Sequence, residues 1–331
     1  MTILITGATG CIGGALAGVL AADGVRVRAL VRSGADTAQL EADGVERAEG
    51  DVRDAGAVRD AVRGCAQVVH LAAQRTQRGL PASVYHDVNA GGTKHVVAAA
   101  RAEGVARLVF ASTIGVHGFV TRAPVDETTA VRPNTPYRLT KWLGEQVVSQ
   151  ARQEGLSTII VRISSTVGLG TTQWLPYCRL VDGGRLRLIG GGRNTTDVVT
   201  LDDVVAGIRL AVLAPDTGTG TYALGGGLEL TARDLACKIA EALGRPEPLR
   251  GPPAIPYRLA VHAASVGFRT TGHLVAFVHD RELFVSDNRV SIRRARAELG
   301  YAPRGDIDGA LRAMVAAFRV DGRLAPAQPA A

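Results

Sequence analysis

The segment that decides the fold opens the chain and reads Thr2-Ile3-Leu4-Ile5-Thr6, followed by Gly7-Ala8-Thr9-Gly10-Cys11-Ile12-Gly13. The apolar run predicts a buried strand, and the glycines lead into a helical pattern. Glycines at this spacing permit a tight turn, close approach of a pyrophosphate and close packing of helix on strand, while the helix N-terminus offers free N–H groups. We predict dinucleotide binding here rather than an ordinary glycine-rich turn, through Gly7, Thr9, Gly10, Cys11, Ile12 and Gly13.

The same alternation of short apolar runs and longer helical patterns continues through the first half, as is typical of a parallel α/β sheet covered on both faces. The expected strands are Thr2–Thr6, Val25–Val31, Val45–Glu49, Gln67–Leu71, Arg107–Ala111 and Thr158–Ile163. The expected helices are Cys11–Asp23, Asp54–Arg63, Ser83–Glu103 and Pro136–Glu154, then Leu201–Leu213, Thr231–Leu243, Pro256–Val266, Ser291–Leu299 and Ile307–Val320. We predict a doubly wound Rossmann domain in residues 1–165 (with 200–214 returning to it), a smaller substrate-binding lobe in 166–322 and a disordered tail in 323–331.

Composition excludes several classes of protein. The chain has 331 residues, 46% of them hydrophobic, which favours a large core over a disordered chain. The net charge of +7 comes from arginines spread along the whole sequence, so we expect no nucleic-acid partner. No apolar run reaches the roughly 18 residues of a membrane span, and the first strand leaves no room for a leader. We therefore expect no membrane partner. The four cysteines lack the spacing of metal ligands, so we expect no metal site. Scattered cysteines also favour a reducing compartment, and we predict a cytoplasmic protein.

The end of the second strand bears on the choice of dinucleotide. It reads Val31-Arg32-Ser33, where an NAD site usually places an acid and an NADP site a cation. Arg32 can contact a 2′-phosphate with two hydrogen bonds, so we predict NADP, with Ser33 beside it. NAD is the alternative, with Arg32 then a solvated loop residue.

Two further strand ends are predicted to contact the cofactor. Asp51 and Val52 follow the third strand, where Asp51 either accepts a hydrogen bond from the adenine or caps the next helix. The fourth strand ends after His70 with Leu71, Ala72 and Ala73, which would let the cofactor lie along the backbone. We assign no chemistry to His70.

Tyr137 and Lys141 are the strongest candidates for chemistry, because residues four apart share one face of a helix. A phenol with a pKa of about 10 is a poor acid–base catalyst near neutral pH. An ammonium about 4 Å away interacts with it by up to about 4 kcal/mol at an effective dielectric near 20, which could lower the phenol by about three pKa units. Thr113, or else Ser112, leaves the preceding strand where a hydroxyl could orient a substrate oxygen.

Together these motifs resemble the extended short-chain dehydrogenase/reductases from residue 1 to about 319. The similar segments are GATGCIGG, GDVRD, VVHLAA, VNAGGT, ASTIGVHG, PNTPYRLTKWLGE and RARAELGYAPR. The resemblance implies that Tyr137 is the acid/base, that Lys141 lowers its pKa and holds the nicotinamide ribose, and that Thr113 is the Ser/Thr member of the set. It also implies that Asn89 serves the family's proton relay or a structural site.

Departures from the family's patterns narrow the expected reaction. Sugar dehydratases carry Asp-Glu where this chain has Ile114-Gly115, and Thr196 stands where nucleotide-sugar enzymes often place an arginine. The segment Leu186–Asn194 and the C-terminal half resemble instead the 3β-hydroxysteroid dehydrogenase and dihydroflavonol-reductase branch, which acts on hydrophobic alcohols and ketones.

We therefore expect an NADP-dependent ketoreductase or secondary-alcohol dehydrogenase that acts on a small-molecule carbonyl or alcohol. The alternatives are a nucleotide-sugar epimerase or 4-ketoreductase, and a non-enzymatic dinucleotide-sensing protein. A homodimer through the helices at Ser83–Glu103 and Pro136–Glu154 is also expected from relatives. Neither the substrate nor the direction or stereochemistry of the reaction follows from the sequence.

Overall fold

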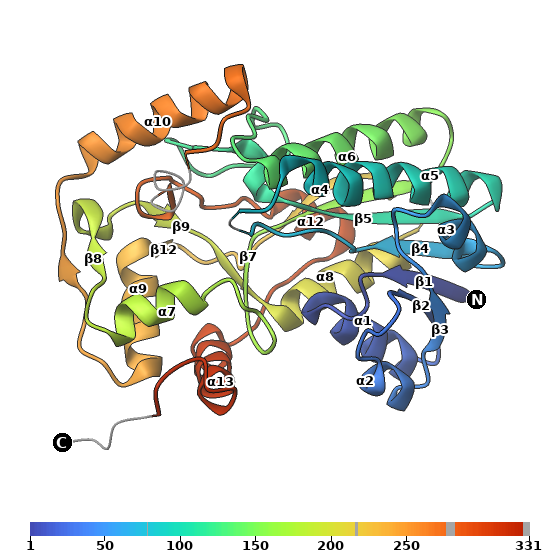
Figure 1. Cartoon of the computed structure of the whole chain (residues 1–331), viewed down its shortest axis with the longest axis horizontal. Coiled ribbons are helices and arrows are strands. Elements are labelled where there is room, and N and C mark those ends of the chain that lie inside the picture. The colour runs from blue at the N-terminus through green and yellow to red at the C-terminus, as the bar shows by residue number, and fades with distance from the viewer. Residues whose placement is uncertain (78, 216–217, 276–281, 327–331) are drawn as a thin grey trace.

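A seven-stranded, fully parallel sheet forms the centre of the protein in the computed structural model, which describes residues 1–77, 79–215, 218–275 and 282–326 (Figure 1). Its order is β11-β6-β5-β4-β1-β2-β3. The strands are β1 (Thr2–Thr6), β2 (Arg26–Val31), β3 (Glu46–Glu49), β4 (Gln67–His70), β5 (Arg107–Thr113), β6 (Thr158–Ile163) and β11 (Gly220–Leu224). The predicted doubly wound Rossmann fold is confirmed.

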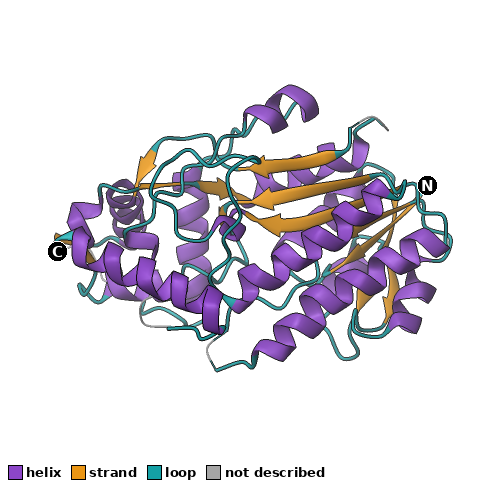
Figure 2. Cartoon of the chain, turned by 90° about the horizontal axis from the view of Figure 1, so that it is seen from above, coloured by secondary structure: helices purple, strands orange, loops and turns teal. Residues whose placement is uncertain are grey.

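Helices cover both faces of this sheet because its strands are apolar on both sides. Ile3 and Ile5 point into one core, while Leu4 between them points into the other. The first face is covered by α1 (Cys11–Ala22), α2 (Ala38–Ala42), α8 (Leu201–Leu213) and α12 (Arg293–Leu299). The second is covered by α3 (Ala55–Val62), α5 (Gly92–Ala102) and α6 (Pro136–Gln153). Figure 2 shows the strands running between these two layers.

A second apolar core lies beyond the carboxyl ends of the strands. Its helices are α7 (Leu175–Asp182), α9 (Ala232–Leu243) and α13 (Ile307–Val320). Short strand pairs frame it: β7 (Ser165–Val167) with β10 (Val198–Thr200), β9 (Thr195–Thr196) with β12 (Leu230–Thr231), and β8 (Arg187–Leu188) with β13 (Leu249–Arg250). A further helix, α10 (Ala254–Thr271), runs along the outer edge of this part of the molecule (Figure 1). The division into two domains at residue 165 stays a prediction.

Several elements differ from the sequence prediction. The expected helix Ser83–Glu103 is broken into α4 (Ala82–Tyr85), a π-helical turn over His86–Gly91 and α5. The strand β11 and the short α2 were not predicted, and α10 extends beyond the expected Pro256–Val266 at both ends. The tail expected to be disordered from Arg323 is packed at its start, because Leu324 is buried in the second core. Residues 327–331 lie outside the described residues.

The second core can be tested with two residues of one helix. Phe318 and Val320 both lie on α13, but their exposed fractions are 3% and 87%. Phe318→Ala removes a buried ring and leaves a cavity, so we expect a loss of about 3–5 kcal/mol in the free energy of unfolding. Val320→Ala removes exposed carbon, and we expect a change within about 0.5 kcal/mol. Urea denaturation of both variants measures the difference; equal losses would contradict the placement of α13.

Candidate functional site

The glycine turn between β1 and α1 has the close contacts that a phosphate-binding turn requires. Gly7 has a φ of 76°, and a Cβ on it would lie 2.7 Å from the Ala72 amide nitrogen. A Cβ on Gly13 would lie 2.2 Å from the Gly7 carbonyl oxygen, so only glycine lets α1 pack this closely on the turn. Gly10 begins α1 without a side-chain cap, and no acid stands in the first turn. The Gly10 amide donates to the Gly7 carbonyl at 3.0 Å and closes the turn, so the amides of the predicted residues Thr9, Cys11 and Ile12 are the ones that suit a bound anion.

The chain leaving β4 lies against this turn. Thr6 binds it twice: its carbonyl accepts from the Leu71 amide at 3.1 Å, and its hydroxyl accepts from the Ala72 amide at 3.2 Å. Strands β1 and β4 are neighbours where the strand order changes direction, which is where dinucleotides bind in such sheets. The structure thus brings the predicted residues of the two strand ends together, including half-buried Ala73.

A buried chain of hydrogen bonds runs through His70 and fixes its protonation. The Thr93 hydroxyl donates its one proton to the Asn89 carbonyl, so it must accept from His70 Nε2–H at 3.1 Å. His70 Nδ1 then accepts from the Thr6 hydroxyl at 2.7 Å. Burial lowers the pKa of His70 to about 3, which keeps the ring neutral. His70, to which the sequence assigned no role, therefore ties the glycine turn to the segment that carries Asn89.

Asn89 has a structural set of contacts. Its side-chain oxygen accepts from the Gln74 amide at 2.7 Å, and its nitrogen donates to the Gln74 carbonyl and to the Thr140 hydroxyl at 3.1 and 3.0 Å. The residue is 1% exposed and lies in the π-helical turn, a distortion found often at functional sites. Asn89 thus joins the loop after β4 to α6, the helix of Tyr137.

Two arginines lie at the ends of β2 and β3. Arg32 and Ser33 are exposed, and Arg32 is close enough to act on Asp51. Asp51 binds Arg53 through two hydrogen bonds of 2.9 Å, and this bond, with the charge of Arg32 adding to it, holds the pKa of Asp51 below its usual value. Arg53 was not predicted, because an arginine after an acid is common on protein surfaces.

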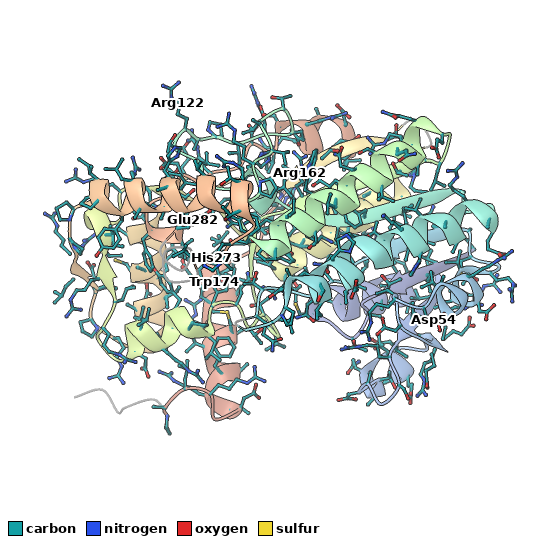
Figure 3. All side chains as sticks on the ribbon, turned by 45° about the horizontal axis from the view of Figure 1, so that its top comes forward. Asp54, Arg122, Arg162, Trp174, His273 and Glu282 are labelled. Carbon is teal, nitrogen blue, oxygen red and sulfur yellow. The ribbon has the colours of Figure 1, made fainter. Side chains whose placement is uncertain are left out.

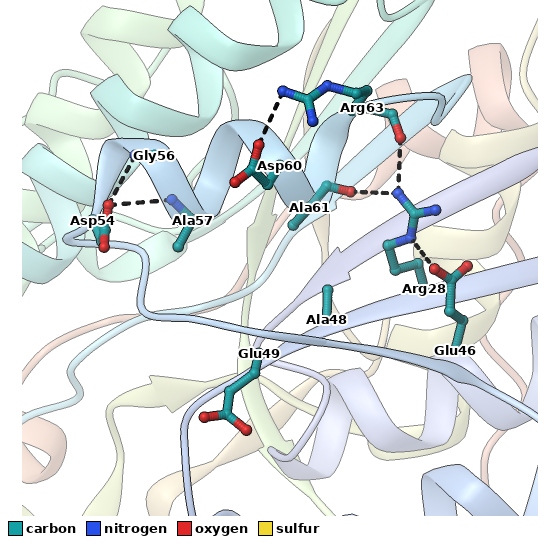
Figure 4. Close-up of a pocket in the computed structure, with 10 residues that line it drawn as sticks. All are labelled: Arg28, Glu46, Ala48, Glu49, Asp54, Gly56, Ala57, Asp60, Ala61 and Arg63. Atoms are coloured by element: carbon teal, nitrogen blue, oxygen red, sulfur yellow. Dashed lines mark hydrogen bonds and ion pairs between the residues drawn. The ribbon is translucent and has the colours of Figure 1, made fainter.

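Asp54, rather than Asp51, caps the next helix. Its carboxylate accepts from the amides of Gly56 and Ala57 at the start of α3, as Figure 4 shows. A surface pocket of about 720 Å³ lies beside α3 and β3. Figure 4 draws the residues that line it. None of the predicted cofactor or catalytic residues lines it. Val52 is buried, and its carbonyl accepts from His95 Nδ1 at 2.9 Å, so its side chain supports α5 rather than facing solvent.

The turn that follows Thr113 at the end of β5 packs against the start of α6, the helix that carries Tyr137. The Thr113 hydroxyl accepts from the Gly115 amide at 3.1 Å, which leaves its own proton free. A Cβ on Gly115 would lie 3.2 Å from Thr113 Oγ1 and 2.9 Å from Arg138 Nε, so the turn after β5 packs directly on the residue after Tyr137. Thr135 caps α6 by accepting from the Arg138 amide, and Pro136 takes the first helical position.

Lys141 is not among the groups that act on the pKa of Tyr137 in the structure, so its expected effect on that phenol stays a prediction. Burial raises the pKa of Tyr137, and the cations that act to lower it are Arg75 and Arg138. The Lys141 ammonium points instead toward the sheet, 4.2 Å from the centre of the Phe110 ring. Helical spacing places the two residues on one face but does not fix where a four-carbon side chain ends.

Lys141 belongs to a buried charge cluster that the sequence did not reveal. It is 2% exposed, and burial lowers its pKa to about 7, against the opposing effect of Glu145 one turn along α6. Glu145 is 1% exposed and pairs through both carboxylate oxygens with Arg162 of β6, which is labelled in Figure 3; the shorter contact is 2.7 Å. Glu145 also accepts a hydrogen bond from Ser112, the other candidate hydroxyl, which is thereby occupied.

Most of the residues predicted to bind the cofactor or to react thus lie at the carboxyl edge of the parallel sheet. The sequence matches the NAD dependent epimerase/dehydratase family over residues 3–225, and the chain belongs to this family. It is an NAD(P)-dependent oxidoreductase of the short-chain dehydrogenase/reductase superfamily.

Named relatives include reductases of ketones. The chain is 33% identical to the 2-alkyl-3-oxoalkanoate reductase of Stenotrophomonas maltophilia, over 96% of this chain and 99% of that protein. It is 31% identical to the 4-hydroxy-2-methyl-3-oxo-4-farnesyl-3,4-dihydroquinoline-1-oxide ketoreductase of Stigmatella aurantiaca, over 92% of each chain. The crystal structure of gox2253 superposes with a TM-score of 0.80 and 28% identity, covering 98% of this chain and 99% of that one.

The buried pair predicts a large asymmetry between two acidic residues. Glu145→Ala leaves the Arg162 guanidinium buried without its partner, so we expect a loss of about 3–5 kcal/mol in the free energy of unfolding. Asp60→Ala removes an exposed pair with Arg63, and we expect a loss below about 1 kcal/mol. Urea denaturation measures both; a small effect at Glu145 would show that the cluster does not hold α6 to the sheet.

Proposed function

We propose that the protein is an NADP-dependent ketoreductase that acts on a small-molecule ketone. The observation that carries the proposal is the meeting of β5 and α6, where Thr113 keeps a free hydroxyl proton beside the helical turn of Tyr137. The ketoreductase relatives support this reaction over dehydration. The missing Asp-Glu pair after Thr113 supports it too.

Each polar group has one task in this reaction. A reduced nicotinamide bound at this edge of the sheet would supply the hydride that the carbonyl carbon accepts. Tyr137 donates its proton to the carbonyl oxygen, which becomes the hydroxyl, and Thr113 orients that oxygen by a hydrogen bond. Lys141, whose buried ammonium has no carboxylate within ion-pair distance among the described residues, holds the nicotinamide ribose. Asn89 positions α6 and the loop after β4.

The binding of the cofactor follows from the carboxyl edge of the sheet. The uncapped start of α1, with no acid in its first turn, would hold the pyrophosphate, and Asp51 and Val52 would lie beside the adenosine. Arg32, with Arg53 beside it, offers the charge that a 2′-phosphate needs. This is why we prefer NADP to the NAD of the family's name.

Nucleotide-sugar epimerisation is the second candidate, and the family match favours it. Thr196 argues against epimerisation of a nucleotide sugar, because this side chain is 1% exposed and carries no charge that could bind a diphosphate.

We also propose a cytoplasmic homodimer. The four cysteines are free, as a reducing compartment requires. On the helices expected to pair, Val96 and Val97 are buried in the core and half-buried Val147 packs against it. Trp142 is half-buried and is not part of that core, so it is the apolar residue of this set that a partner could cover. Sedimentation velocity would give twice the monomer mass.

Replacing the proton donor tests the reaction. In Tyr137→Phe the ring remains but the hydroxyl is lost, so we expect reduction of ketones by NADPH to slow by about 10²–10⁴-fold. Fluorescence titration should show NADPH binding within a factor of a few of the wild type. The assignment of Tyr137 fails if the variant retains full activity.

The choice of cofactor has its own test. Arg32→Ala removes a contact to the 2′-phosphate, so we expect the preference for NADPH over NADH in Kd to fall by about 10–100-fold. Arg26→Ala is the matched control, because Arg26 is exposed at the opposite end of the same strand. An unchanged preference in Arg32→Ala would place the 2′-phosphate elsewhere or return the assignment to NAD.

A further inference from the structure

Exposed apolar side chains gather on and beside α10. Ile255 and Leu259 are 71% and 66% exposed, and Val266 follows on the same helix. The spacing of four and then seven residues places the three on one side of the helix. Leu249 shortly before the helix and Val275 shortly after it are exposed as well. We call these five residues the apolar face of α10.

The opposite side of α10 is bound to the body of the protein. Val261, Ser265 and Phe268 are buried, each at most 5% exposed. Figure 1 shows the helix lying along the outer edge of the molecule, away from the central sheet. The apolar face is therefore not a disordered edge but one side of an 18-residue helix whose other side is fixed.

The acidic and basic residues within the segment that carries this face are all basic. From Pro248 to Val275 the sequence contains no Asp or Glu, but it contains Arg250, Arg258 and Arg269. Arg258 pairs with Asp287, whereas Arg250 and Arg269 are exposed and have no ion pair within the described part of the chain. An apolar stripe flanked by unpaired arginines is complementary to a surface of anionic lipid.

The buried side of α10 reaches the start of the helix that carries Tyr137. Ser265 accepts a hydrogen bond from Asn134 at 2.9 Å, and Asn134 also donates to Glu282 at 2.8 Å. Glu282 in turn pairs with Arg138, the residue after Tyr137 (Figure 3). A surface that held α10 would therefore lie next to the candidate active site.

We propose that the apolar face of α10 docks the enzyme on the surface of an anionic lipid bilayer. Ile255, Leu259 and Val266 enter the boundary between headgroups and acyl chains, and Arg250 and Arg269 contact lipid phosphates. A second copy fits this face less well, because two acid-free faces of a chain with a net charge of +7 repel each other.

This docking is compatible with the absence of a spanning segment. Among the described residues no helix is long and apolar enough to cross a bilayer. The sequence predicts no membrane partner because it has no apolar run long enough to span a bilayer. A helix that lies in the membrane surface does not need such a run. Delivery of a lipophilic ketone from the bilayer to Tyr137 would follow, and this consequence alone rests on the proposed function.

Vesicle sedimentation of the full chain tests the docking. The vesicles are phosphatidylcholine alone and phosphatidylcholine mixed with phosphatidylglycerol. We expect the wild type to bind the anionic vesicles, and to bind less as salt is added. Ile255→Glu/Leu259→Glu should weaken the binding by at least about ten-fold, because the two apolar side chains that would enter the bilayer become charged. The control Val320→Glu/Leu213→Glu changes exposed apolar residues on other helices and should bind as the wild type does.

Three results would overturn the proposal. The first is that the wild type fails to bind anionic vesicles, and the second is that the α10 variant binds as well as the control variant. The third is that sedimentation velocity shows a dimer for the wild type and the control but a monomer for the α10 variant, which would assign the face to a second copy. Circular dichroism confirms that each variant is folded. Reduction of a water-soluble ketone by NADPH, measured on the same variants, tests the reaction separately, because it does not depend on vesicle binding.

Discussion

A buried carboxylate determines where α6, the helix that carries Tyr137 and Lys141, lies. Glu145 binds Arg162 of β6 with both oxygens and accepts from Ser112 of β5, so α6 is tied to two neighbouring strands at once. Removing charges from water is costly, and the pair is retained only because its hydrogen bonds are satisfied. Tyr137 and Lys141 lie two turns and one turn before Glu145 on the same side of α6. Their positions at the edge of the sheet therefore depend on this ion pair.

The other side of the site is held by small residues and neutral hydrogen bonds. Gly7 and Gly13 allow β1, α1 and the chain after β4 to approach each other within distances that any side chain would prevent. Neutral His70 links this turn, through Thr93, to the π-helical segment of Asn89, and Asn89 reaches Thr140 on α6. The glycine turn after β1 and the helix of Tyr137 are thus parts of one connected, buried network. Such a network is organised before any ligand binds.

The elements that could be predicted are those whose signal is local. The glycine turn, the apolar strands and the spacing of Tyr137 and Lys141 are all visible in short windows of sequence, and the fold follows from them. The strand β11 was missed because its five residues pair with β6 from more than fifty residues away. The direction of the Lys141 ammonium and the partner of Glu145 were missed for a similar reason. Both depend on residues of other strands, Phe110 and Arg162, which no spacing within α6 reveals.

The central claim is that a dinucleotide lies between the opening glycines and Tyr137. A crystal structure with NADPH bound measures this most directly. The account predicts the pyrophosphate on the amides at the start of α1, and C4 of the nicotinamide facing a space that the hydroxyls of Tyr137 and Thr113 both reach within hydrogen-bond distance, about 2.6–3.2 Å from a substrate oxygen. A nicotinamide ring bound away from Tyr137, or a Tyr137 hydroxyl enclosed by protein in the complex, would contradict it.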